Sequence, residues 1–330
     1  MRKPGFRIIA GLIILAVLLM RTDLLAAPDM RADAINKAFA QAQDLAADEA
    51  MNNPEQKYRQ ILGQAVTVEQ EPMPQEVDAY VRFMPASGAK SMPGGISLVD
   101  SEAEYSYNTK LFGQLPLAMG VITSYTGINN TTPVDLPSRL TGISFGFETT
   151  FPFFNVKDTY FRVGVAPSFY GDRWNINSSN FRIPSRLFWI YQPDPKLVLI
   201  AGVAVSVDYS EAFFPILGAI YKPNERLAFN IIPPRPTITY SLDDKWTAFA
   251  EAGMKAEEYS VSAYGQKSTI LQYNDMRAGA GISYSVNKHV DASLSAGMVF
   301  SRYLRYRQDC YPKVSLDNGP YTEFRVEIGM

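Results

Sequence analysis

The sequence predicts an all-β protein: a transmembrane antiparallel β-barrel of 12 to 14 strands, preceded by a short helical N-terminal segment. Three observations predict this fold. They are an N-terminal export signal, long runs in which apolar and polar residues alternate, and tyrosines that repeat at the ends of such runs. The chain has only 19% charged residues but 22 glycines, which favours strands over charged helices.

The first 26 residues are predicted to form a signal peptide. Arg2, Lys3 and Arg7 make a basic start, residues 8–20 are apolar, and the small residues around Ala26 allow cleavage. The apolar stretch is shorter than the roughly 20 residues that a membrane-spanning helix needs. We therefore expect the chain to be exported.

Residues 27–74 are predicted to form a helical periplasmic segment or a plug. Apolar residues recur at helical spacing between Ile35 and Ala46, and Asn53-Pro54 has the pattern of a helix N-terminus. Such a segment could tether the barrel, bind a partner, or reach into a lumen that a barrel of this size leaves wide. The sequence leaves these three possibilities open.

Residues 75–330 are predicted to form the outer-membrane barrel. The run 246–255 (WTAFAEAGMK) alternates a wholly apolar face with a face that carries Glu251 and Lys255, and later runs repeat this split. A soluble sandwich with one wet face shows the same alternation. Runs of about 9 to 15 residues exceed most soluble strands and favour the membrane barrel. Because lipid offers no partner to a strand edge, such a sheet must close on itself.

Four seven-residue stretches predict short turns at one end of the barrel: YQPDPKL, YKPNERL, YSLDDKW and YSVNKHV. Each has an Asp or Asn that can bond its own backbone, followed by a basic residue or His and a new apolar run. In outer-membrane barrels the short turns face the periplasm, and outward aromatic residues form a girdle there. The predicted periplasmic girdle consists of the tyrosines that open the four stretches: Tyr191, Tyr221, Tyr240 and Tyr284.

The strand count depends on the segment between Tyr221 and Tyr240. This segment has to cross the membrane and return with Pro233, Pro234 and Pro236 in its middle, although a spanning strand needs roughly 9 to 11 residues. The barrel has 14 spanning strands if this hairpin crosses and 12 if it stops short.

Charged residues in the polar register of the last strands, Glu257 and Glu323 among them, are predicted to face the lumen. Because opposite charges on neighbouring strands can pair, they could simply fill the interior with ion pairs. They could also line a path that selects solutes. The candidates for lining the lumen are Glu251, Lys255, Asp275, Arg277, Asp291, Arg325 and Glu327.

The sequence predicts no enzyme, no metal site and no cofactor. His289 is the only histidine and occupies the basic position of the fourth turn, without the nucleophile and orienting partner that a catalytic histidine needs. Cys310 is the only cysteine, which excludes an internal disulfide and paired cysteine ligands. The balance of 31 basic and 33 acidic residues argues against a nucleic-acid partner. The partners we expect are outer-membrane lipid, the outer-membrane assembly machinery and, for a channel, a small solute.

Two stretches resemble a known family. RLFWIYQPDPKLVLIAGVAVS and FPILGAIYKPNERLAFNIIPPRPTITYSLDDKWTAFAEAGM are similar to the uncharacterised bacterial outer-membrane barrels grouped as domain of unknown function 6268. The resemblance is strongest between Arg186 and Ser285. It implies a barrel in a Gram-negative outer membrane, and it implies no activity and no site residues.

A small-solute channel or transporter is the function that these observations favour. A wide barrel with a charged interior suits that role. The alternative is a non-enzymatic barrel that binds a surface partner or supports the envelope through its outer loops. The two differ in whether the lumen conducts.

Overall fold

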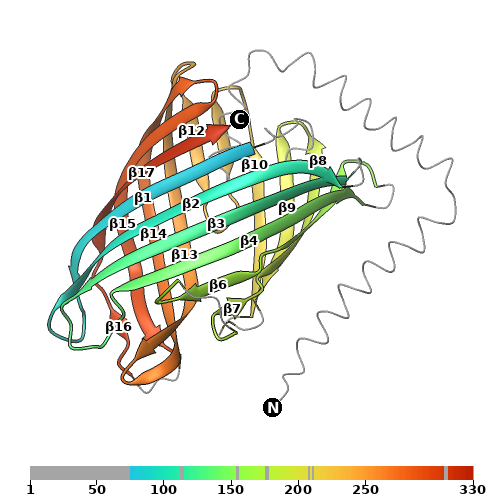
Figure 1. The fold of residues 1–330 in the computed structure, drawn as a ribbon. Helices are drawn as coiled ribbons and strands as arrows, with labels where there is room; N and C mark the ends of the chain where they lie inside the picture. The colour runs from blue at the N-terminus through green and yellow to red at the C-terminus, as the bar shows by residue number, and fades with distance from the viewer. Residues whose placement is uncertain are drawn as a thin grey trace, which may run out of the picture. The chain divides into compact units, whose positions relative to one another are not determined.

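The computed structural model describes residues 75–111, 115–153, 156–174, 178–206, 209, 212–307 and 311–329. The predicted signal peptide, the predicted helical segment 27–74 and Cys310 lie outside the described residues. Within those ranges no helix is long and apolar enough to cross a membrane. The described chain forms one sheet of 17 strand segments that curls into a closed antiparallel barrel (Figure 1).

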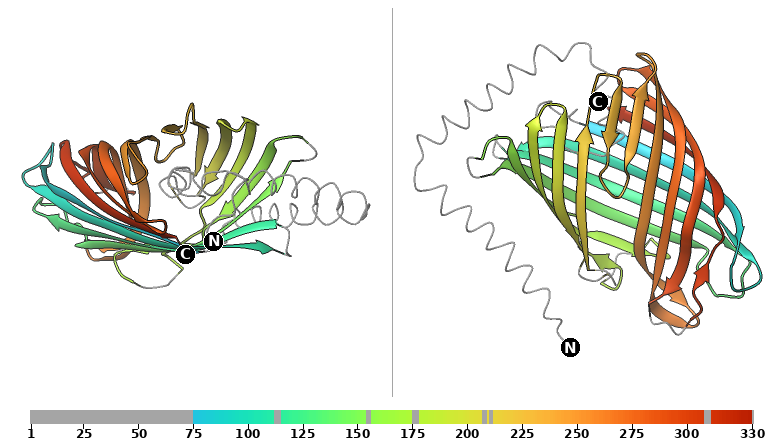
Figure 2. Two further views of the ribbon diagram at one scale, coloured as in Figure 1. Left: turned by 90° about the horizontal axis from the view of Figure 1, so that it is seen from above. Right: turned by 180° about the vertical axis from the view of Figure 1, so that it is seen from behind.

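The first and last strands close the barrel. β1 (Gln75–Gly88) pairs with β2 (Gly95–Leu111) on one edge and with the C-terminal strand β17 (Gly319–Gly329) on the other. The segments between β2 and β17 follow one another round the ring, as Figure 2 shows from two further sides. They are β3 (Leu115–Asn130), β4 (Arg139–Pro152), β5 (Thr159–Val165), β6 (Ser168–Gly171), β7 (Phe181–Arg182), β8 (Ser185–Asp194), β9 (Leu197–Val205), β10 (Phe213–Tyr221), β11 (Leu227–Asn230), β12 (Thr237–Ser241), β13 (Trp246–Ala263), β14 (Gln266–Asn287), β15 (Val290–Tyr306) and β16 (Val314–Ser315).

Three positions in the ring are each filled by two consecutive segments. β4 pairs with both β5 and β6, and β15 pairs with both β16 and β17. β7 and β8 share the position beside β5 and β6. Pro167 lies between β5 and β6, and Pro184 lies between β7 and β8. A proline has no amide hydrogen and so cannot donate a ladder hydrogen bond at these breaks. Counted by position, the barrel has 14 strands, which confirms the predicted range at its upper limit.

The hairpin of β11 and β12 belongs to the ring but is too short to cross a membrane by its strands alone. β11 has 4 residues and β12 has 5, which correspond to about 13 to 17 Å at the usual strand rise. Its proline-rich turn extends the ladder, because the amides of Ala252 and Met254 donate to the carbonyls of Pro236 and Pro234. The turn therefore lies against the middle of β13.

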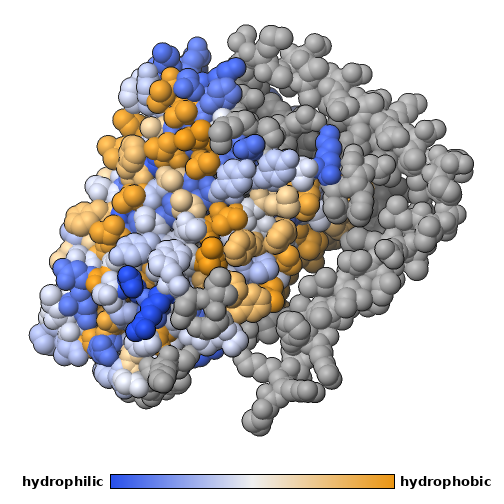
Figure 3. Space-filling view, viewed as in Figure 1, coloured by the Kyte–Doolittle hydropathy of each residue, from blue (hydrophilic) through white to orange (hydrophobic). Residues whose placement is uncertain are grey.

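The outward faces of the strands are apolar. Val81 and Phe324 are each 52% exposed and Leu217 is 73% exposed, whereas Arg82 and Arg325, which neighbour the first two in sequence, are buried. Figure 3 shows apolar residues across the wall, with hydrophilic residues gathered towards the ends. An exposed apolar wall of this kind is stable in contact with lipid.

The four predicted turns are confirmed. In each, an Asp or Asn side chain accepts a hydrogen bond from the backbone amide two residues further on, at distances of 2.7 to 3.0 Å. The turns share one end of the barrel with the end of β17, since the Gly329 amide donates to the His289 carbonyl. We call this the inner end, because short turns face the periplasm in outer-membrane barrels, and the opposite end the outer end. The accepting side chains are Asp194, Asn224, Asp243 and Asn287.

Candidate functional site in the lumen

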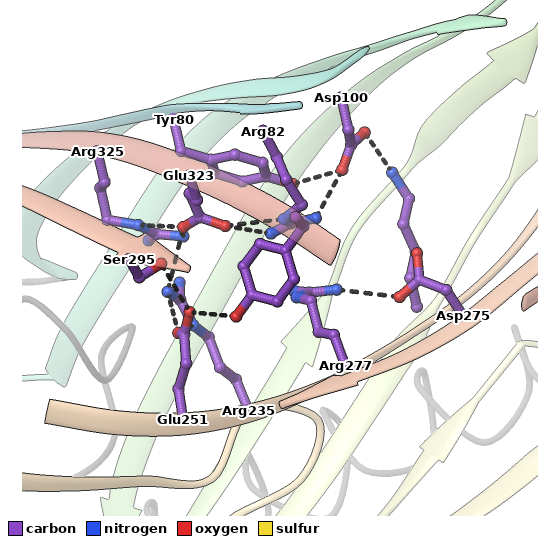
Figure 4. A network of polar contacts seen from close by, with 12 residues as sticks. Tyr80, Arg82, Asp100, Arg235, Glu251, Asp275, Arg277, Ser295, Glu323 and Arg325 are labelled. Atoms are coloured by element: carbon purple, nitrogen blue, oxygen red, sulfur yellow. Dashed lines mark hydrogen bonds and ion pairs between the residues drawn. The ribbon is translucent and has the colours of Figure 1, made fainter. Parts of the chain in front are cut away.

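A network of ion pairs occupies the middle of the lumen (Figure 4). At its centre Arg82 lies directly opposite Asp100 on β2 and Glu323 on β17 in the strand register. Its guanidinium donates to the Asp100 carboxylate at 2.9 Å and to the Glu323 carboxylate at 2.5 Å. Thr126 on β3 donates to the second Asp100 oxygen at 2.8 Å. These charges are buried, so their pairing offsets the cost of removing them from water.

One ion pair of this network crosses the lumen. The Lys255 ammonium on β13 lies 2.9 Å from the Asp100 carboxylate on β2. Four strands of the sheet, β14, β15, β17 and β1, separate β13 from β2. The contact therefore joins opposite parts of the wall, whereas filler ion pairs would join neighbouring strands.

A second contact reaches the network from the proline-rich turn of the β11–β12 hairpin. Arg235 donates to Glu251 on β13 at 2.5 and 2.8 Å and approaches Glu323 on β17 at 3.4 Å. Glu251 also accepts from Tyr321 and Ser295, each at 3.4 Å. The short hairpin thus places a guanidinium against the network instead of extending to the outer end.

Further members of the network lie on β14. Asp275 accepts from the Tyr273 hydroxyl at 2.7 Å and from Arg277 at 3.2 Å. Asp275 pairs in register with Lys255, so this pair continues the network beside the Lys255 to Asp100 contact.

The barrel narrows above the network, towards the outer end. β6 forms a parallel bridge from Gly171 to Ser260 of β13, and the rings of Tyr170 and Tyr259 meet edge to face at 5.6 Å. At this level the described wall runs from β4 through β6 directly to β13 and bypasses β7 to β12. The ring at this level therefore has nine strand positions: β1 to β4, β6, β13 to β15 and β17. This number is close to the size at which side chains alone fill a barrel.

An apolar cluster fills the narrowed outer half, and we call it the apolar cap. Its side chains pack against one another inside the outer end of the barrel. Its buried members come from all round the narrowed wall: Met84, Ile96, Leu98, Ile128, Val134, Leu140, Tyr259, Val261, Ala263, Leu271, Tyr273, Val299, Leu304, Tyr306, Val314, Leu316 and Tyr321.

Arg302 on β15 is a buried cation within this half of the barrel. Its side chain is fully buried, and its three guanidinium nitrogens have no hydrogen-bond partner among the described residues. A buried cation without a partner costs free energy. Arg302 is therefore a destabilising feature of the junction between the cap and the network.

The structure brings most of the predicted lumen residues together. Glu251, Lys255, Asp275 and Arg277 take part in the network, and Arg325 donates to Glu323 at 3.2 Å and to Asp78 at 2.6 Å. Asp291 and Glu327 lie nearer the inner end, where they pair with each other in the strand register.

Sequence reasoning missed three residues of the network: Arg82, Asp100 and Arg235. The period of two that placed Glu251 inside also places Arg82 inside, because Val81 and Phe83 beside it are apolar. Asp100 follows the same rule on β2. No local pattern predicts that Arg235 turns inward, since it lies in a proline-rich turn.

The predicted girdle tyrosines lie at the inner end with other aromatic residues. Tyr221 is 46% exposed and Tyr240 is 43% exposed. Ring pairs at this end join Tyr191 with Trp189, Tyr221 with Phe229, and Tyr284 with Trp246, with centroids 4.7 to 6.3 Å apart. Such side chains suit the membrane interface, where an apolar ring meets a polar surface.

A closed antiparallel barrel with an apolar wall and a charged interior defines an outer-membrane β-barrel. The chain belongs to the family described as Domain of unknown function (DUF6268), which matches residues 116–317. This match confirms the resemblance seen in the turn-bearing stretches. A comparison with curated proteins found no match.

Solved structures with a similar fold are distant in sequence. The COG4313 outer membrane channel from Pseudomonas putida F1 has 8% identity and a TM-score of 0.44, over 78% of this chain and 96% of that chain. The TodX deltaS2S3 mutant monoaromatic hydrocarbon channel has 11% identity and a TM-score of 0.37, over 78% and 90%. The KdgM porin in complex with disordered oligogalacturonate has 11% identity and a TM-score of 0.33, over 77% and 99%. The likeness concerns the barrel alone and identifies no solute.

Proposed function

We propose that this protein is an outer-membrane channel for small polar solutes and that the ion-pair network controls its opening. The observation that carries the proposal is the contact between Lys255 and Asp100 across the lumen, at 2.9 Å. Side-chain contacts across a lumen can separate while the backbone ladder stays intact, so they suit a gate.

The inner half of the lumen supports the same role. There the ring has its full 14 strands, which leaves a lumen wider than side chains alone fill. On the β1, β2 and β17 side its lining is charged, as a path for polar solutes requires, whereas Ile190, Val198, Ile200 and Ile220 form a buried apolar cluster on the wall of β8 to β10. The network and the apolar cap both lie inside the barrel along this path, which supports a gated channel in which both move on opening.

Planar bilayer recordings test the proposal. The wild-type protein is expected to show rare openings, and Lys255→Met is expected to open several times more often, because it removes the contact across the lumen while Arg82 still pairs with Asp100. Lys288→Met is the matched control, because Lys288 is exposed in a turn at the inner end and its loss leaves the lumen unchanged.

Silent recordings from all three proteins, together with no solute uptake into liposomes, would contradict a channel. Equal opening by Lys255→Met and Lys288→Met would keep the channel and remove the network as its gate.

A second function is favoured by the contacts of the outer loops. Tyr264 in the β13–β14 turn and Asp135 in the loop before β4 exchange two hydrogen bonds, at 2.9 and 3.0 Å, and Tyr311 stacks on Tyr264 at 4.1 Å. Loops fixed to one another over a capped barrel would suit a rigid platform for a surface partner. Replacing residues 308–313 by a Gly-Ser linker would then reduce partner binding and leave solute uptake unchanged.

A further inference from the structure

Four carboxylates form a single row across the inner half of the lumen. Glu104 on β2 pairs in register with Asp78 on β1, Asp78 pairs with Glu327 on β17, and Glu327 pairs with Asp291 on β15. Residues paired in this way lie about 4.5 to 5.5 Å apart at their Cα atoms. We call these four residues the acidic row.

The negative charge of the acidic row is only partly balanced by neighbouring cations. Among the described residues, Arg325 contacts the row, with its guanidinium 2.6 Å from the Asp78 carboxylate. Like charges placed directly opposite each other on neighbouring strands repel. The repulsion has to be relieved by protons or by a cation from outside the described residues.

The residues around the acidic row also carry a net negative charge. Arg162 and Arg186 on the facing wall both pair with Glu148, at 3.2 and 2.7 Å, and Glu76 and Glu102 lie one register step from the row on β1 and β2. Together with the acidic row and Arg325, these described residues comprise seven carboxylates and three guanidiniums, and Arg235 also interacts electrostatically with Asp78 and Glu327. The field inside this part of the lumen favours positive charge.

Unpartnered oxygens point to a ligand at the centre of the row. Glu327 is only 5% exposed, and its Oε2 atom has no hydrogen-bond partner among the described residues. The Oδ1 atom of Asp78, opposite it, is also without one. Buried polar atoms are normally paired, so these two atoms mark a place that a donor would complete.

We propose that the acidic row binds the ammonium groups of an organic amine. An ammonium carries three donors and a positive charge, which match adjacent carboxylates that have spare acceptors. Among the described residues no three acidic, His or Cys side chains form a group that could hold a metal ion, so the geometry favours an amine over a chelated metal. Asp78, Glu104 and Asp291 are partly exposed and give the amine access from the lumen. This inference rests on the proposed channel, because it names the class of solute.

Titration calorimetry with spermidine tests the inference on the full-length protein in detergent. Saturable binding to the wild type is expected, and the double variant Glu104→Gln/Asp291→Asn should weaken it about tenfold or more, because two charge-assisted contacts are lost. These two positions avoid the buried centre of the row and so limit damage to the fold. Glu225→Gln, an exposed acid in a turn at the same end, should bind as the wild type does.

Other results of these experiments would overturn either the amine site or the proposed channel. Equal binding by wild type and double variant, or no binding by either, would overturn the acidic row as an amine site. Equal heats from calcium chloride would assign the row to inorganic cations and overturn the amine. A barrel that binds spermidine but never conducts would retain this inference and reject the proposed channel.

Discussion

Arg82 and Arg302 have the same side chain and similar burial but opposite surroundings. Arg82 has a carboxylate on each side, at 2.9 and 2.5 Å, whereas the guanidinium of Arg302 has no hydrogen-bond partner within the described part of the chain. Removing one member of a buried ion pair leaves its partner charge unpaired, which costs about 3 to 5 kcal/mol. Removing an unpaired buried charge relieves a cost instead.

The two arginines therefore predict opposite changes in stability. Arg82→Met is expected to lower the free energy of unfolding by about 3 to 5 kcal/mol, and Arg302→Met is expected to raise it by about 1 to 4 kcal/mol. Urea unfolding in lipid vesicles measures both. A loss of stability in Arg302→Met would mean that a partner from outside the described residues binds Arg302.

At the scale of single elements, the turns at the inner end depend on one side chain each. The Asp243 carboxylate accepts from the amides of Lys245 and Trp246, at 2.7 and 2.8 Å, and so joins β12 to β13. Asp243→Ala is expected to cost about 1 kcal/mol, measured by the same unfolding assay. Asp244→Ala is the control, because the neighbouring Asp244 is exposed and its replacement should change stability by less than about 0.5 kcal/mol. An equal loss in both variants would contradict the assigned role of Asp243.

The elements also show how far the sequence predicts the structure. Alternation along β13 places Glu251 and Lys255 inside, and the turn stretches predict the corners, because both depend on neighbours within a few residues. The partners of Lys255 and Arg235 depend on which strands face each other across the lumen, and alternation within a strand carries no such information. The same limit applies to the bridge from β6 to β13, which narrows the barrel and creates the apolar cap.

At the scale of the whole molecule, the interior changes character along the axis. The acidic row lies at the inner end, the balanced network follows, and the apolar cap lies at the outer end. This order follows from the wall: the ring has its full number of strands near the turns and fewer beyond the β6–β13 bridge. Charged side chains fit the wide part and packed apolar side chains fit the narrow part. The buried apolar cluster on β8 to β10 is the exception in the wide part.

Closure of the barrel itself predicts a specific cross-link. Val81 on β1 and Phe324 on β17 are paired in register across the seam between the first and last strands, and both point outward. In a Cys310→Ser background, Val81→Cys/Phe324→Cys is expected to form a disulfide, because opposite residues in such a pair lie within bridging distance. The disulfide would make the chain between the two cysteines circular. The boiled protein should therefore migrate at a different position on gels before and after treatment with a reducing agent.

Leu294 supplies the matched control for this cross-link. It pairs with Phe324 from the other side, on β15, and is also exposed. Two strand spacings, about 10 Å, then separate it from Val81, which exceeds the roughly 7 Å limit for a disulfide. Val81→Cys/Leu294→Cys should therefore stay reduced under the same oxidation. A disulfide in this control but not across the seam would mean that β1 and β17 are not neighbours, and the closed barrel would be the wrong fold.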